Sequence, residues 1–248
     1  VLGRALAGIR RDRYLLATKT GRYGLKMPDF DFSPARIRSS LEESLTRLGV
    51  DTIDLFQLHD IEFGSLPSIV EDSIPTMQAL KAEGKIRFWG VTGLPLHIFR
   101  YVLEHTTPDT ILSYCRYALN DNSLAELLPT LSERGVGVIN ASPTGMGLLT
   151  NRGSPDWHPA SDQIKQVCQQ AAELCAQRNL DITQLALQFA TQNPAIATTL
   201  VGTASVENIE NNVRWISQDL DPDLLAAVQG VLAPVQGMSW PEGRPENN

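Results

Sequence analysis

Lys19 and His59 stand at the ends of two apolar segments of the sequence, where packing needs neither side chain. Lys19 follows the apolar residues of YLLATKTG, and His59 closes IDLFQLH. A lysine ammonium beside a phenol stabilises the phenolate and lowers the pKa of the phenol, so that a tyrosine can exchange a proton near neutral pH. The alternatives are a lysine that extends from a strand end into water and a half-buried structural histidine. Equivalent positions on neighbouring segments favour a shared pocket and a chemical role.

Short apolar segments alternate with longer amphipathic segments along the whole chain. We expect strands at residues 14–18, 53–59, 86–93, 110–117, 136–142 and 198–202. We expect helices at the N-terminus and at residues 34–48, 68–82, 96–105, 123–134, 162–177, 182–192, 206–216 and 223–232. Such alternation predicts parallel strands joined by right-handed crossovers, in a doubly wound sheet or a (β/α)8 barrel. A leading helix and six strands fit an eight-stranded barrel that lacks its first two strands.

The active site of a parallel barrel lies at the C-terminal ends of its strands. In this sequence those ends carry Lys19, His59 with Asp60, Thr92 with Gly93, residues 114–117, Ser142 with Pro143, and Gly202 with Thr203. We therefore expect a cation and an imidazole to face one polar pocket. Asp60 and Glu62 either touch a polyhydroxy substrate there or belong to a solvated loop.

Composition limits the classes of partner. The net charge of −7 argues against nucleic acid and against an anionic membrane surface, because both require a basic face. The three cysteines show no C-x-x-C pairing, which favours a reducing compartment. No apolar run is long enough to span a bilayer, and the histidines lack the spacing of metal ligands. We expect a cytoplasmic protein without a metal, a monomer or weak dimer, that acts on a small molecule.

The first residues continue a helical pattern without a start signal. The chain begins with Val1, and VLGRALAGI reads as the middle of a helix, so we expect upstream residues to be missing from this sequence. No linker or repeat divides the rest, which predicts a single domain over residues 1–240. The polar end PEGRPENN predicts a disordered tail over residues 241–248.

Several longer motifs together resemble a known family. LLATKTG, SSLEESLTRLGVDTIDLFQLHD, GKIRFWGVTG, SPTGMGLLT and TTLVGTASVENIENNV are similar to the aldo-keto reductase superfamily. HDIEFGSL, GVTGLPLHIFRYVLE, GVGVINASP and WHPA resemble, within it, the L-galactose dehydrogenases. The likeness covers nearly the whole chain. It implies the (β/α)8 barrel of this superfamily and a hydride transfer between a nicotinamide cofactor and a carbonyl or alcohol carbon.

The resemblance also implies roles for Lys19 and His59. Family members move the proton with a tyrosine, whose pKa a lysine tunes; an aspartate holds the lysine, and a histidine orients the substrate oxygen. Lys19 matches the lysine and His59 the histidine. The tyrosine and the aspartate belong to an upstream motif that this sequence does not contain. Tyr23 follows the lysine segment, so the tyrosine's role is not carried over to it.

Cofactor residues follow from the same resemblance. No G-x-G-x-x-G follows a strand, which leaves a Rossmann site unsupported. Thr92 and Gly93 would meet the carboxamide of the nicotinamide, and Tyr114 would lie beside its ring. The loop over the pyrophosphate would contain Ser142, Pro143, Thr144, Gly145 and Leu148. Ala141 occupies the place of the aromatic residue on which the nicotinamide usually stacks.

The helix after the sixth strand is expected to bind the adenosine part. Helix N-terminal amides favour a phosphate, and the candidate contacts are Gly202, Thr203, Ser205, Glu207, Asn208 and, for adenine, Asn212. A 2′-phosphate requires Arg or Lys. Gly202, Thr203 and Asn208 stand where NADP-using members carry basic residues, and Glu207 and Glu210 add negative charge. The prediction is NAD, with NADP as the alternative.

Two functional hypotheses follow. In the first, the protein oxidises L-galactose or a similar aldose at C1 to the lactone with NAD; a related aldehyde or aldose reductase using NADPH is a variant of it. In the second, the chain is a catalytically impaired, truncated paralogue that retains dinucleotide binding, because it lacks the family tyrosine and aspartate.

Overall fold

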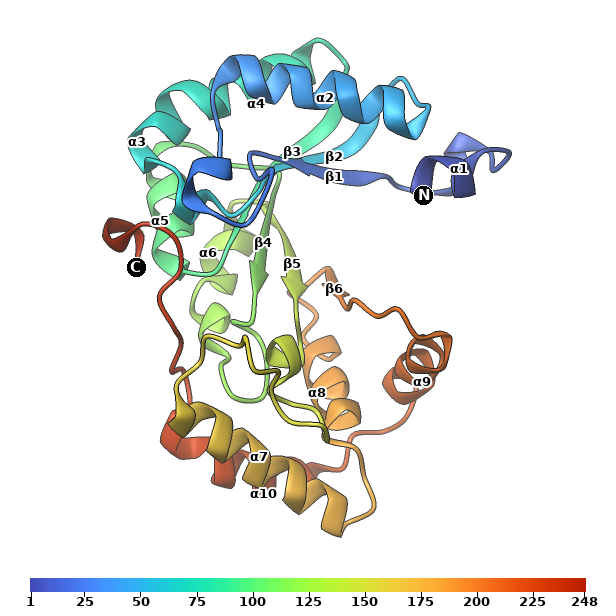
Figure 1. Cartoon of the computed structure of the whole chain (residues 1–248), viewed down its shortest axis with the longest axis vertical. Coiled ribbons are helices and arrows are strands. Elements are labelled where there is room, and N and C mark those ends of the chain that lie inside the picture. The colour runs from blue at the N-terminus through green and yellow to red at the C-terminus, as the bar shows by residue number, and fades with distance from the viewer. The chain divides into compact units, whose positions relative to one another are not determined.

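A computed structural model describes residues 1–248 (Figure 1). The chain folds into two compact units: unit 1 contains Val1–Leu112 and Pro241–Asn248, and unit 2 contains Ser113–Trp240. The boundary falls inside a strand and not in a linker, so the single domain expected over residues 1–240 stays a prediction. The expected disordered tail is wrong. Residues 241–248 pack within unit 1, where Asn247 is only 2% exposed.

Strands and helices alternate as the sequence predicts, and the strand order is β1-β2-β3-β4-β5-β6. The strands are β1 Ala17–Thr20, β2 Ile53–Leu58, β3 Ile86–Gly93, β4 Thr110–Tyr114, β5 Gly137–Ala141 and β6 Thr198–Leu200. The helices of unit 1 are α1 Leu2–Leu6, α2 Pro34–Leu48, α3 Leu66–Ser68, α4 Ile74–Ala82 and α5 Leu96–His105. Those of unit 2 are α6 Leu128–Glu133, α7 Asp162–Gln177, α8 Ile182–Thr191, α9 Val206–Ile216 and α10 Pro222–Leu232. The pairs β1–β2, β2–β3 and β5–β6 are parallel.

The core of unit 1 forms around β2. Ile53, Phe56 and Leu58 are fully buried, and the nearly continuous burial of this strand is typical of a parallel strand covered on both faces. Helix α2 begins where predicted, since the Ser33 hydroxyl accepts a hydrogen bond from the Arg36 N–H at 3.4 Å. It ends at Gly49, whose φ of 69° permits the left-handed C-cap.

Several predicted elements differ from the structure in their bounds. The first strand, expected at residues 14–18, is β1 at Ala17–Thr20, so Lys19 lies within it. Two of the differences have local reasons. The helix expected over residues 68–82 is interrupted by a π-helical turn, Ile69–Ser73, which ends two residues before Pro75. A proline has no N–H for the helix, and its ring clashes with the carbonyl four residues earlier. The strand expected over residues 110–117 ends at Tyr114, because Cys115 has a left-handed φ of 60°.

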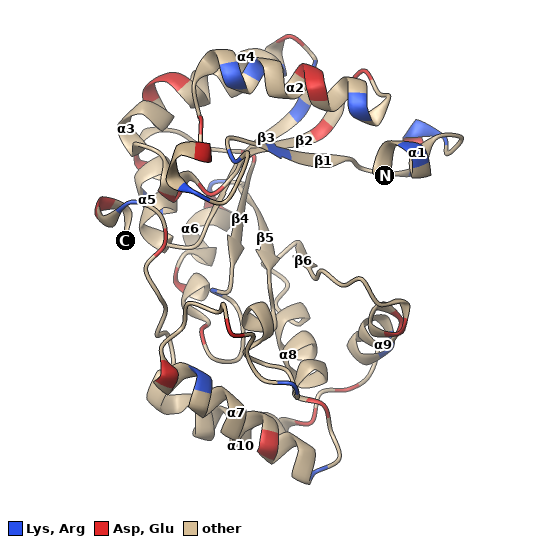
Figure 2. Ribbon diagram, viewed as in Figure 1, with Lys and Arg blue, Asp and Glu red and all other residues tan.

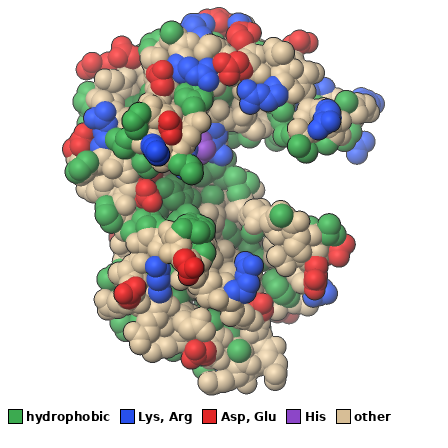
Figure 3. All heavy atoms as spheres, viewed as in Figure 1, with side chains coloured by type: hydrophobic (Ala, Val, Ile, Leu, Met, Phe, Trp, Pro, Cys, Tyr) green, Lys and Arg blue, Asp and Glu red, His purple; other side chains and the backbone are tan.

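The helices of unit 2 differ in their packing, their charge and their exposure to solvent. Helices α7 and α10 pack side by side (Figure 1). Helix α8 contains no charged residue, whereas α2 of unit 1 carries charges of both signs (Figure 2). Helix α9 leaves apolar side chains at the surface (Figure 3), with Val206 72% and Val213 58% exposed. No helix in the structure combines the length and apolarity needed to cross a bilayer.

Candidate active site

The register of unit 1 brings Lys19 and His59 to the same edge of the sheet. Lys19 lies opposite Gln57, and Thr20 lies opposite Leu58, so β1 and β2 end together. His59 follows directly, and its N–H donates to the Thr20 carbonyl oxygen at 2.8 Å. The positive charge of Lys19 contributes to a lowered pKa of the His59 imidazole.

The imidazole of His59 is partly buried, with 31% of the side chain exposed. Burial lowers the pKa of His59, and the positive charges of Lys19 and Arg22 lower it further, while Asp60 opposes them. His59 Nε2 lies 3.6 Å from Asp60 Oδ2. Since the lowered pKa leaves the imidazole neutral at neutral pH, this contact is not a charged pair. A neutral imidazole can donate or accept a hydrogen bond at a substrate oxygen.

Asp60 connects the ends of three segments. Its carboxylate accepts a hydrogen bond from Arg22 at 2.6 Å. Its N–H donates to the Thr92 hydroxyl at 2.9 Å, and that hydroxyl donates to Asp60 Oδ1 at 3.1 Å. Asp60 has a left-handed φ of 55°, a conformation that persists in a non-glycine residue only where its surroundings impose it. Asp60 therefore fixes the loop that carries His59.

Thr92 and Gly93, the predicted carboxamide contacts, end β3. Thr92 is fully buried and holds Asp60, and a Cβ at Gly93 would lie 2.4 Å from Glu62 Oε2. Glu62 is fully buried, and its Oε1 accepts from the Leu94 N–H at 3.0 Å. The burial of Asp60 and Glu62 excludes the solvated-loop alternative. The cofactor role of Thr92 and Gly93 stays a prediction.

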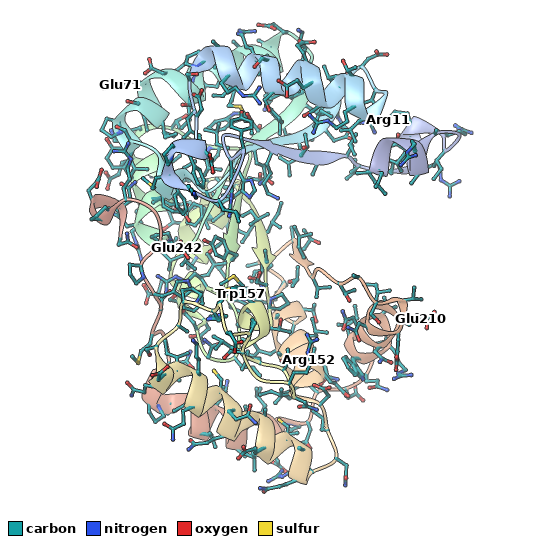
Figure 4. The ribbon with its side chains drawn as sticks, in the orientation of Figure 1. Arg11, Glu71, Arg152, Trp157, Glu210 and Glu242 are labelled. Atoms are coloured by element: carbon teal, nitrogen blue, oxygen red, sulfur yellow. The ribbon has the colours of Figure 1, made fainter.

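Glu242, which Figure 4 labels on the C-terminal segment, interacts electrostatically with Asp60 and Arg22. Burial raises the pKa of its carboxyl, the negative charge of Asp60 raises it further, and Arg22 opposes both. Neither Arg22 nor Glu242 was singled out in the sequence. Arg22 lies in an irregular loop and Glu242 in a segment expected to be disordered, and no local pattern links either residue to β2.

In unit 2, the predicted pyrophosphate loop is built from left-handed residues. Ser142 has a φ of 55°, Gly145 of 58° and Met146 of 52°. The Ser142 N–H donates to the Leu200 carbonyl oxygen at 3.3 Å, and its carbonyl oxygen accepts from Gly145 at 2.9 Å. The N–H groups of Gly147 and Leu148 also donate within the loop, to the carbonyl oxygens of Thr144 and Gly145 at 3.2 Å each, and the contact of this loop with a pyrophosphate stays a prediction. Thr144 and Leu148 continue the turn, with Leu148 buried.

The end of β4 lies against this loop. The Cys115 N–H donates to the Ala141 carbonyl oxygen at 3.0 Å. Burial raises the pKa of the Cys115 thiol to about 12, while a hydrogen bond with Ser142 opposes the rise. Tyr114 therefore ends the strand next to the loop that starts at Ser142, whereas its proximity to nicotinamide stays a prediction.

His158 packs against this loop. It is 3% exposed. Its Nε2 donates to the Gly145 carbonyl oxygen at 2.9 Å, and its Nδ1 accepts from the Ala160 N–H at 3.1 Å. Both ring nitrogens are thus used in packing. The adjacent Trp157 is 68% exposed.

The connection from β6 to α9 presents the predicted adenosine contacts. The Ser205 hydroxyl accepts from the Asn208 N–H at 3.2 Å and caps α9. The Thr203 hydroxyl accepts from Ser205 at 3.1 Å and from the Asn208 amide at 3.4 Å. Gly202, Thr203, Glu207 and Asn208 are exposed, whereas Asn212 is buried. These hydroxyl, amide and carboxylate groups fit the ribose hydroxyls of a dinucleotide, and the N–H groups at the start of α9 fit a phosphate.

Comparisons with known proteins give consistent matches. The model of the aldo/keto reductase family matches residues 1–233. L-galactose dehydrogenase of Arabidopsis thaliana is 47% identical over 256 residues, covering 100% of this chain and 79% of that protein. D-arabinose 1-dehydrogenase of Saccharomyces cerevisiae is 33% identical, covering 76% of this chain and 59% of that protein. The structure of aldo-keto reductase AKR11C1 from Bacillus halodurans, holo form, superposes with a TM-score of 0.77 at 26% identity, covering 97% of this chain and 78% of that chain.

Proposed function

Because the chain belongs to the aldo/keto reductase family of oxidoreductases, which use nicotinamide cofactors, we propose that it oxidises C1 of L-galactose or a similar aldose to the lactone with NAD. The observation that carries the proposal is the 47% identity to L-galactose dehydrogenase along the whole chain. D-arabinose 1-dehydrogenase and D-threo-aldose 1-dehydrogenase, at lower identity, support the aldose class. The proposal includes a (β/α)8 barrel to which the six strands belong.

The residues of unit 1 would act on the substrate. His59, neutral at neutral pH, would form a hydrogen bond with the C1 hydroxyl and orient it. Lys19 would supply the positive charge that lowers the pKa of the family's proton-transferring tyrosine, a residue that this sequence does not contain. Asp60 would hold the His59 loop through Thr92 and Arg22. A bound NAD would supply the hydride acceptor for C1.

The test is an absorbance assay at the NADH band with L-galactose, L-fucose and D-arabinose, each with NAD and with NADP. We expect the highest kcat/KM with L-galactose and NAD. Titration of the same protein with NADH, followed by fluorescence, measures dinucleotide binding separately. Binding without oxidation of any aldose would contradict the dehydrogenase and favour the impaired paralogue. A preference for NADPH-dependent reduction would favour the reductase.

Cofactor choice can be tested at the start of α9. We expect Asn208→Arg to lower KM for NADP about tenfold relative to wild type, because an arginine forms charge-assisted hydrogen bonds with a 2′-phosphate. The measurement is the ratio of kcat/KM for NADP to that for NAD. Asn211→Arg adds the same charge one turn further along α9 and is the matched control. Equal effects of the two substitutions would show that Asn208 does not lie beside the 2′-phosphate of a bound NADP.

A further inference from the structure

The last eight residues, Pro241–Asn248, hold the turn that follows β2. This turn is the 3-10 helix Ile61–Phe63. The Arg244 N–H donates to the Glu62 carbonyl oxygen at 2.9 Å, and the Asn247 amide donates to the carbonyl oxygens of Glu62 and Gly64 at 2.8 and 2.9 Å. Arg244 Nε donates to the Phe63 carbonyl oxygen at 3.2 Å. We call residues 241–248 the C-terminal clasp.

The clasp has a fixed conformation of its own. The Asn248 side chain accepts from the Glu242 N–H at 2.8 Å and donates to the Glu242 carbonyl oxygen at 2.9 Å. Gly243 has a φ of 75°, and a Cβ there would lie 2.3 Å from the Glu62 carbonyl oxygen. Only glycine fits this approach. The clasp therefore contacts the turn in one defined way.

The turn held by the clasp is continuous with the site. Asp60 precedes it and contacts His59 and Thr92. Glu62 lies within it, and its side chain holds the Leu94 N–H next to the end of β3. A left-handed Asp60 needs an environment that imposes its conformation. The hydrogen bonds of the clasp to consecutive carbonyl oxygens supply part of that environment.

We propose that the C-terminal clasp is a positioning element of the active site, in which Asn247 fixes the turn after β2 and, through it, the orientation of the His59 imidazole. The catalytic meaning of this role rests on the proposed function, whereas the positioning itself does not. Asn247 touches neither His59 nor a reacting group in this scheme, and it acts through the backbone of Glu62 and Gly64.

The test measures the titration of His59 by NMR, together with kcat and KM for the best aldose. The charged groups facing His59 are Asp60, Lys19 and Arg22. In Asn247→Ala, we expect the loosened turn to admit water, so that the pKa of His59 rises toward its ordinary value, since burial is the largest cause of its lowering. We also expect kcat to fall about tenfold with little change in KM, as for a misplaced catalytic group.

Gly243→Ala disrupts the same clasp by a steric clash with the Glu62 carbonyl oxygen. It should raise the pKa of His59, as Asn247→Ala does. Glu71→Gln alters an exposed carboxylate of unit 1 outside the clasp (Figure 4), and should leave both the titration and kcat unchanged. A lower melting temperature in Asn247→Ala and Gly243→Ala, with the pKa of His59 unchanged, would overturn the proposal. The clasp would then only stabilise the fold. If the wild type oxidises no aldose but the pKa of His59 rises in both variants, the proposed function fails and the positioning role stands.

Discussion

Replacement of His59 by leucine is expected to lower kcat/KM for aldose oxidation by about 10²- to 10³-fold, the usual effect of removing one preorganised hydrogen-bond donor at a reacting oxygen. Leucine retains much of the volume of the imidazole but none of its nitrogens. Because the proposed role of His59 is a hydrogen bond to the reacting hydroxyl, the loss should fall mainly on kcat. The measurement is steady-state kinetics with L-galactose and NAD.

His97→Leu provides the control for this substitution. His97 is an exposed residue of α5 in the same unit, so its replacement should change kcat/KM less than twofold. The fluorescence titration with NADH should give the same Kd for both variants and the wild type. A loss below about threefold in His59→Leu, which is far less than the loss of one such donor, would contradict the role assigned to His59.

The second large effect concerns the stability of unit 2. Asp121→Ala is expected to lower the free energy of unfolding by about 3–5 kcal/mol, because removal of one partner from a buried ion pair leaves the other charge uncompensated. The Asp121 side chain is 2% exposed, and Arg116, which is 16% exposed, donates to it at 2.7 Å. The Ser123 N–H and hydroxyl also donate to it, at 3.0 and 2.6 Å.

Urea unfolding followed by circular dichroism measures this loss. Asp156→Ala removes an exposed carboxylate of the same unit and should change the free energy of unfolding by less than about 0.5 kcal/mol. A similar, small change in Asp121→Ala would show that the pair with Arg116 contributes no more than an exposed ion pair. The ion pair of Arg116 with Asp121 lies near the candidate site in the sequence, because the segment that contains it directly follows the end of β4.

The strand ends of the candidate site could be predicted because each depends on a local pattern. Apolar runs predicted β2 and β3, whereas the apolar run at Leu15 and Leu16 lies before β1 and not within it. The alternation with helices predicted parallel strands, which bring Lys19, His59 and Thr92 to one edge of unit 1. The partners of these residues could not be predicted. Arg22 lies in an irregular loop, and Glu242 reaches the cluster from the far end of the sequence. Their proximity to Asp60 depends on tertiary packing that has no periodic signal.

Other differences arise where a local backbone conformation overrides the pattern. The left-handed Cys115 ends β4 early, and Pro75 follows a π-helical turn in the predicted helix. The polar composition of residues 241–248 indicated disorder, but the Asn247 amide and the Gly243 backbone find specific partners on the turn after β2. Composition describes average behaviour and does not detect such a match.

The central claim is that the ammonium of Lys19 and the imidazole of His59 share one pocket, and the titration of His59 by NMR tests it most directly. We predict that the pKa of His59 lies below its ordinary value of about 6.5 and rises in Lys19→Met, because a neighbouring positive charge is removed. The pKa of His158 should not respond to Lys19→Met, whereas Lys165→Met should raise it. A His59 pKa at or above the ordinary value, unchanged in Lys19→Met, would contradict the shared pocket.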